Sequence, residues 1–161
     1  MPPLPITLRP MEASELEAFI LHTIEGYADD RAVAVSARAE DARRNARAQV
    51  EALLPRGLAT PDHHIYTVVE GDAAVGHLWL AVTDVDGFRS VVVYDIQLRE
   101  EARGRGVGRR VMELAEEAAS GLGARDLELH VFARNTRARR LYEALGYEIT
   151  SLCMRKTLRS S

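Results

Sequence analysis

The feature that most constrains this chain is a glycine-rich run, Arg103-Gly104-Arg105-Gly106-Val107-Gly108, between segments of different hydrophobic period. The residues before it, 91–98, are rich in β-branched side chains, whereas the apolar residues after it recur at spacings of three and four. The first N–H groups of a helix have no partner within the helix, and glycine lets an anion approach them closely. The run therefore predicts a strand, an anion-binding loop and a helix, in that order.

Two common phosphate-binding loops do not fit this run. The nucleoside-triphosphate loop requires Gly-Lys-Ser/Thr, but Gly108 is followed by Arg109 and Arg110. The dinucleotide fingerprint would start at Gly104 and require a glycine where Arg109 stands. This run therefore belongs to neither of these two types of phosphate-binding loop.

The hydrophobic periods along the rest of the chain predict an alternation of strands and helices. Period-two runs and turn residues predict strands over residues 6–9, 65–69, 74–80, 91–98, 127–132 and 147–155. Apolar stripes, caps and terminators predict helices over residues 12–26, 37–54, 107–121 and 135–146. The order βααβββαβαβ indicates an α/β or α+β mixed sheet flanked by helices, in a single domain over residues 1–161.

Composition narrows the class of protein. With 161 residues, 47% hydrophobic and 28% charged, the chain has the make-up of a water-soluble globular protein, and its apolar runs are too short to span a membrane. The N-terminus lacks the pattern of a secretion signal, so we expect a cytoplasmic protein. The single cysteine, Cys153, is interpreted as a small buried side chain. The net charge of −3 does not favour nucleic acid as a partner.

Two motifs resemble those of the GNAT superfamily of N-acetyltransferases. Residues 103–108 fit its Arg/Gln-x-x-Gly-x-Gly/Ala motif, and residues 135–147 resemble the downstream motif in which an Asn precedes a Leu-Tyr-Glu-x-Leu-Gly-Tyr helix end. The resemblance covers about residues 65–156. It implies a GNAT-like, mostly antiparallel sheet and acetyl-CoA as cosubstrate.

The resemblance also implies how acetyl-CoA binds. Main-chain groups of Ile96, Gln97 and Leu98 would pair with the pantetheine arm as an added strand. The pyrophosphate would lie on main-chain amides of Arg103, Gly104, Arg105, Gly106, Val107 and Gly108. Asn135 would contact the cofactor near the arm, and Tyr142 would lie near the sulfur.

Catalytic roles follow from the same resemblance and from residue chemistry. Tyr142 matches the family tyrosine that serves as general acid, and a main-chain N–H near Leu98 would stabilise the oxyanion. The general base stays open. Asp95 is an unusual residue within a β-rich run, and His130 has an intrinsic pKa that suits proton transfer near neutrality. Tyr94 and a water-mediated relay are further alternatives. Gln97 stands where many relatives carry an acid and cannot ionise.

We therefore expect an acetyl-CoA-dependent N-acetyltransferase that acts on a primary amine, in a small molecule or a protein, by direct transfer. Six acids between residues 12 and 30, without a Lys or Arg, favour a cationic acceptor. A non-catalytic acyl-CoA-binding sensor or regulatory module is the alternative, and nucleic-acid binding through the arginine clusters ranks below both. His63-His64 does not form the pattern of a metal site, so no metal is expected. The oligomeric state is open, with a homodimer as one alternative.

Overall fold

The structure, a computed structural model, describes the main chain of residues 2–35 and 39–159 and the side chains of residues 2–26 and 40–159. They form two compact units, one that runs through His130 and one that starts at Val131. Among the described residues, no helix combines the length and apolar character needed to cross a membrane. The interpretation of residues 1–161 as one domain stays a prediction.

The first unit is built on a sheet in the order β1-β2-β3-β4-β5. The strands are β1 (Ile6–Pro10), β2 (His63–Glu70), β3 (Ala73–Val85), β4 (Phe88–Leu98) and β5 (Asp126–Leu129). Neighbouring strands from β1 to β4 are antiparallel, and β5 is parallel to β4. The sheet is thus mixed and mostly antiparallel, which confirms the predicted fold class.

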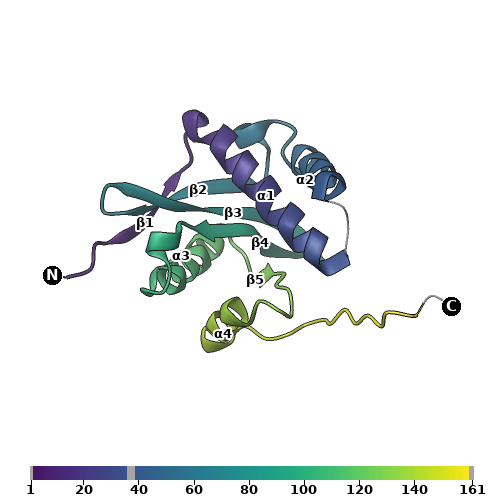
Figure 1. The fold of residues 1–161 in the computed structure, drawn as a ribbon. Helices are drawn as coiled ribbons and strands as arrows, with labels where there is room; N and C mark the ends of the chain where they lie inside the picture. The colour runs from purple at the N-terminus through teal and green to yellow at the C-terminus, as the bar shows by residue number, and fades with distance from the viewer. Residues whose placement is uncertain (1, 36–38, 160–161) are drawn as a thin grey trace. The chain divides into compact units, whose positions relative to one another are not determined.

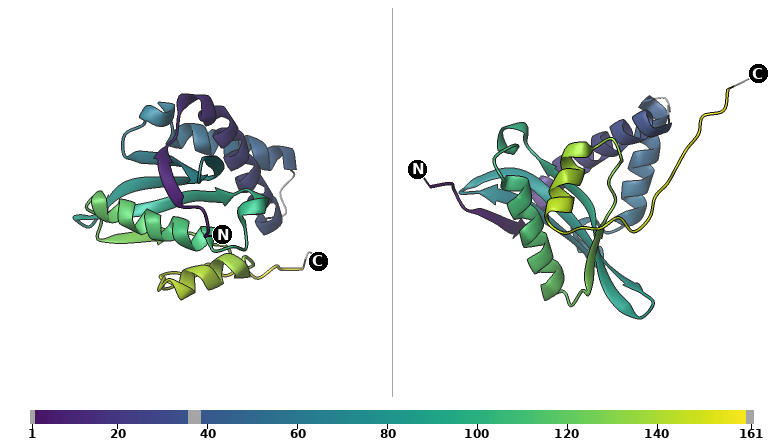
Figure 2. Two further views of the ribbon diagram at one scale, coloured as in Figure 1. Left: turned by 90° about the vertical axis from the view of Figure 1, so that its left-hand side faces the viewer. Right: turned by 90° about the horizontal axis from the view of Figure 1, so that it is seen from below.

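Helices cover both faces of this sheet (Figures 1 and 2). A short 3₁₀ turn (Ala13–Glu15) leads into α1 (Leu16–Val35), which packs with α2 (Ala39–Leu53) over one face, and α3 (Val107–Gly121) covers the other. Another 3₁₀ turn (Gly57–Ala59) precedes β2, and a third (Glu100–Ala102) follows β4. The core beneath α1 and α2 includes Phe19, Ala46 and Trp79, while α3 buries Val111 and Met112.

Tight turns join β2 to β3 and β3 to β4. Gly71 joins β2 to β3 with a φ of 62°, and Asp86 and Gly87 join β3 to β4 with φ of 51° and 81°. A pair of left-handed residues matches the right-handed twist of the flanking strands, so it favours a tight hairpin.

The first helix is longer than its sequence predicted. The sequence predicts its end at Gly26, but α1 continues to Val35. A Cβ atom on residue 26 would lie 2.7 Å from the Nε2 atom of Gln97, so this glycine lets α1 approach β4 rather than ending the helix. The predicted start of the second helix at residue 37 lies outside the described residues, and α2 begins at Ala39.

The second unit contains α4 (Thr136–Ala144). Asn135 caps it, as predicted, because its Oδ1 atom accepts from the Ala138 N–H over 3.3 Å. The predicted strand over residues 147–155 is wrong, since no strand forms there. A strand needs a neighbouring main chain to pair with as well as alternating side chains, and here Leu152 and Met154 are 77% and 90% exposed. Cys153 is also exposed, contrary to expectation.

Candidate active site

A bulge divides β4 into two parts. Val93 lies opposite Leu80 and Asp95 lies opposite Trp79, so Tyr94 is an extra residue on the β4 side of the ladder. Side chains normally alternate between the faces of a strand, but a bulge lets two successive residues point the same way. Here Tyr94 stacks on Trp79 at 5.0 Å between ring centroids, and Asp95 points to the same face, towards α1.

The carboxylate of Asp95 is the centre of a polar cluster under α1. Its Oδ2 atom accepts from His77 Nε2 over 2.7 Å, from Thr23 Oγ1 over 3.2 Å and from Gln97 Nε2 over 3.3 Å. The side chains of His77 and Asp95 are only 8% and 12% exposed, and Thr23 is fully buried. Because buried polar groups need partners, these three donors let a carboxylate occupy the interface between helix and sheet.

Gln97 joins this cluster to the helix. Its Nε2 atom also donates to the main-chain oxygen of His22 in α1 over 3.2 Å. Asp95 and Gln97 lie on one face of β4, where the hydrogen bond joins them. The sequence did not identify Thr23 or His77, which lie far from Asp95 along the chain.

Beyond the bulge, one edge of β4 has no neighbouring strand within the described sheet. The parallel ladder between β4 and β5 ends at Val93 and Leu129. The Arg99 N–H donates to Val75 of β3, so by alternation the main chain of Gln97 also faces β3, while that of Ile96 and Leu98 faces the opposite edge. Ile96 and Leu98 thus present main-chain groups where a further extended chain could pair.

The glycine-rich run lies directly after this open edge. Gly104 and Gly106 adopt left-handed φ of 73° and 82°, which other L-residues rarely adopt. Gly106 is the N-cap of α3, no side chain caps the helix there, and a Cβ atom on it would meet nothing within 4 Å. The first helical main-chain bond runs from the Arg110 N–H to the Gly106 oxygen, so the amides of Val107 and Gly108 precede it and have no acceptor within the helix.

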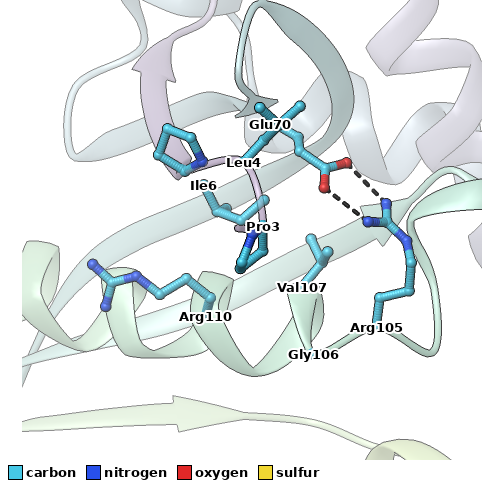
Figure 3. A pocket seen from close by; sticks show the side chains of 9 residues that line it. Pro3, Leu4, Ile6, Glu70, Arg105, Gly106, Val107 and Arg110 are labelled. Atoms are coloured by element: carbon cyan, nitrogen blue, oxygen red, sulfur yellow. Dashed lines mark hydrogen bonds and ion pairs between the residues drawn. The ribbon is translucent and has the colours of Figure 1, made fainter. Parts of the chain in front are cut away.

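The two loop arginines are engaged with the protein itself. Arg105 forms a two-pronged ion pair with Glu70 of β2, with both N–O distances 2.8 Å (Figure 3). Its Nε atom also donates to the Glu101 main-chain oxygen. The Arg103 Nε atom donates to the Leu98 oxygen over 3.0 Å. The hydrogen bonds from Arg105 lower the pKa of Glu70 below its usual value. These contacts fix the shape of the loop.

The Glu70–Arg105 pair borders a shallow pocket of about 330 Å³ beside the start of α3. Figure 3 shows Val107 and Ile6 on its apolar lining, with Arg110 at another part of the rim. This pocket lies near β1, whereas Asp95 lies on β4 beneath α1, so the pocket does not include the polar cluster.

The remaining predicted site residues lie near or beyond the end of the first unit. His130 directly follows β5 and is exposed, and the described hydrogen bonds to Asp95 do not include it. In the second unit, the Asn135 side chain caps α4, and Tyr142 is half-buried, with its ring 5.8 Å from that of Tyr147. The catalytic roles of His130 and Tyr142 and the contact of Asn135 with cofactor stay predictions.

The acidic segment near the N-terminus is largely paired with arginines where it is described. Glu12 and Glu15 bind Arg9, and Glu25 binds Arg43. The side chains of Asp29 and Asp30 lie outside the described residues. Neutralised carboxylates attract a cation weakly, so this segment gives little support to the expected preference for cationic acceptors.

The arrangement of an open strand edge, a glycine-rich loop and a helix N-terminus agrees with what comparison with known proteins finds. Residues 25–147 match the acetyltransferase (GNAT) family. The chain belongs to this family and is an N-acetyltransferase.

One relative, YycN, extends the match over nearly the whole chain. The uncharacterized N-acetyltransferase YycN of Bacillus subtilis (strain 168) is 35% identical over 154 residues, which cover 95% of this chain and 99% of YycN. The crystal structure of YycN has a TM-score of 0.91 at 34% identity and covers 97% of this chain and 100% of that one. A mycothiol acetyltransferase of Jonesia denitrificans is 42% identical over 90 residues, 55% of this chain but 28% of its own length.

Proposed function

We propose that this protein binds acetyl-CoA and transfers its acetyl group directly to a primary amine of a small molecule or a protein. The observation that carries this proposal is the continuous path from the open edge of β4 at Ile96 and Leu98, through the left-handed glycines, to the uncapped start of α3. Family membership favours this enzyme over the non-catalytic sensor.

Each part of that path suits one part of acetyl-CoA. The main-chain groups of Ile96 and Leu98 would pair with the amides of the pantetheine arm, as an added strand does. The amides of Val107 and Gly108, together with the helix dipole of α3, would hold the pyrophosphate. Gly106 leaves space for this approach, since nothing lies within 4 Å of a Cβ atom built there. The family resemblance implies that Asn135 and Tyr142 also contact the cofactor.

The proposed reaction needs a base, an oxyanion donor and an acid. The amine nitrogen forms a bond to the acetyl carbon and passes a proton to the base. Asp95 is the first candidate base because its carboxylate is held in place, and His130 is the second. The Leu98 N–H would stabilise the oxyanion. When the carbon–sulfur bond breaks, Tyr142 would give its hydroxyl proton to the departing thiolate.

Two measurements test this proposal. Titration calorimetry with acetyl-CoA should show binding, and a thiol-release assay with a panel of primary amines should show turnover. The panel would contain a diamine, an aminoglycoside, a lysine analogue and a peptide with a free α-amino group. Absence of acetyl-CoA binding would refute the proposed function.

A matched pair of variants tests the acid. Tyr142→Phe should lower kcat about 100-fold with little change in acetyl-CoA affinity, as expected when a general acid is removed. Tyr147→Phe removes a hydroxyl from the neighbouring ring of the same unit and should retain kcat within about twofold. If the two variants had equal kcat, Tyr142 would not be the general acid.

A further inference from the structure

We propose that His77 is a positioning residue for catalysis, which holds the Asp95 carboxylate by its Oδ2 atom so that Oδ1 takes the proton of the acceptor amine. This inference rests on the proposed function and adds a residue to it. His77 comes from β3, outside both family motifs, and it has no role in the steps described above.

The donors of the Asp95 cluster converge on a single oxygen atom. His77, Thr23 and Gln97 come from β3, α1 and β4, and all donate to Oδ2. An oxygen of an ionised carboxylate offers about two lone-pair directions, so three donors saturate Oδ2. Hydrogen bonds from three separate elements also fix the plane of the carboxylate, which a single contact would not do.

The other oxygen, Oδ1, stays available. Within the described residues it accepts no hydrogen bond, and no side-chain oxygen or nitrogen there is both fully buried and without a partner. Oδ1 of Asp95 therefore retains contact with solvent. Since Oδ2 is saturated, a proton leaving the amine would go to Oδ1.

The His77 contact is the strongest of the three by distance and surroundings. At 2.7 Å it has the length of a charge-assisted hydrogen bond. The imidazole is 8% exposed and lies edge-to-face against Phe19 with ring centroids 4.8 Å apart. An ionised carboxylate only accepts hydrogen bonds, so Asp95 also fixes the proton of His77 on Nε2. The packed ring and the fixed tautomer make His77 a rigid donor.

A conservative pair of substitutions separates positioning from packing. His77→Leu keeps a buried side chain of similar size but removes the donor, whereas His77→Gln keeps an N–H that can reach Oδ2. Rates of thiol release from acetyl-CoA would be measured with the wild-type protein's best amine from the panel above. We expect kcat to fall about 30- to 100-fold in His77→Leu, as for a misplaced catalytic group, and to return within about fivefold in His77→Gln.

Thr67→Val is the matched control. Thr67 lies opposite His77 on β2 and is 3% exposed, but its hydroxyl donates to Glu15 and not to Asp95. We expect it to lower the melting temperature while kcat of the folded protein stays within about twofold. Acetyl-CoA affinity, measured by calorimetry, should be retained in all three variants, because none of these side chains belongs to the loop that would bind the cofactor.

The outcomes distinguish this inference from the proposed function. If His77→Leu retains wild-type kcat, or if His77→Gln is as slow as His77→Leu, His77 does not position the base although the protein is still an acetyltransferase. If the wild-type protein releases no thiol with any amine, the proposed function fails and this inference fails with it. A low kcat in His77→Leu, rescue in His77→Gln and retained kcat in Thr67→Val would support the inference.

Discussion

The two halves of β4 have different tasks. Ser90–Val93 pairs with strands on both sides, and Val91 is completely buried. Beyond the bulge at Tyr94, residues 95–98 pair with β3 alone, are only partly buried and include two polar side chains, Asp95 and Gln97. The first half of β4 thus supports the core. The second half leaves main-chain groups unpaired at one edge and contains the hydrogen-bonded carboxylate of Asp95.

The difference shows how a stable sheet can contain an open edge. Unpaired strand edges and buried carboxylates are both unfavourable, and here they occur together over four residues. The bulge limits them to the end of the strand, while the first half remains fully paired. We therefore expect substitutions in the first half to change stability and substitutions in the second half to change rate.

The largest expected effect comes from Asp95→Asn. The substitution keeps the shape of the side chain but removes the proposed base, so kcat should fall about 100- to 1,000-fold. Thiol-release assays at saturating acetyl-CoA would measure this loss, and circular dichroism would confirm folding. If this variant retained activity, Asp95 would not be the base, and His130 would become the first candidate.

Val91→Ala tests the other half of the same strand. Loss of two buried methyl groups should destabilise the fold by about 2 kcal/mol, which corresponds to a melting temperature about 4–8 °C lower for a chain of this size. The kcat of the folded protein should remain within about twofold. A large loss of kcat in Val91→Ala would break the proposed division of the strand.

The sequence predicted most elements of the fold, but it did not predict the register between β3 and β4 that brings the residues of the polar cluster together. Counted from the hairpin partners Val85 and Phe88, a regular ladder would place Asp95 opposite Leu78, away from His77 and α1. The extra residue Tyr94 moves it opposite Trp79 instead. Since a one-residue shift reverses the face of every later side chain, periodicity alone could not bring Asp95, His77 and Thr23 together.

The loop was predicted more fully than the cluster, because its chemistry resides in consecutive residues. The glycine-rich run predicted a strand, a loop and a helix in that order, and β4, the loop and α3 follow one another as expected. The contacts of the arginines could not be predicted, since the partner of Arg105 is Glu70, 35 residues earlier in the chain. The prediction of a final strand over residues 147–155 was wrong because side-chain alternation does not specify a pairing partner.

Gly106→Ala extends the comparison to the loop that follows the open half of β4. A φ of 82° is unfavourable for alanine by about 1–2 kcal/mol, so the loop should change shape and present its amides poorly. We expect acetyl-CoA to bind about tenfold more weakly by calorimetry, with less change in kcat at saturation. Unchanged affinity would show that the cofactor binds elsewhere.

Glu15→Gln tests a part of the first unit without a proposed role in catalysis. The hydrogen bonds from Arg9 lower the pKa of Glu15 to about 2, from 4.5. Because the folded pKa is depressed, the stabilisation is complete above about pH 4.5 and is lost as the pH falls towards 2. The melting temperature of Glu15→Gln should be lower at pH 7 and should fall less steeply between pH 5 and 3. An unchanged slope would contradict this ion-pair contribution.

Gly26→Ala should have the smallest effect. It tests the contact between α1 and residues 95–98, the second half of β4. The new methyl group would lie 2.7 Å from Gln97 Nε2, so the amide must turn away and its bonds to Asp95 and His22 weaken. With one of three donors lost, kcat should fall about two- to fivefold, while the better helix propensity of alanine offsets the loss of stability. Gly121→Ala, in the open space at the end of α3, should raise stability and leave kcat unchanged. If both variants have wild-type kcat, Gln97 contributes nothing to the position of Asp95, and Thr23 and His77 hold the carboxylate without it.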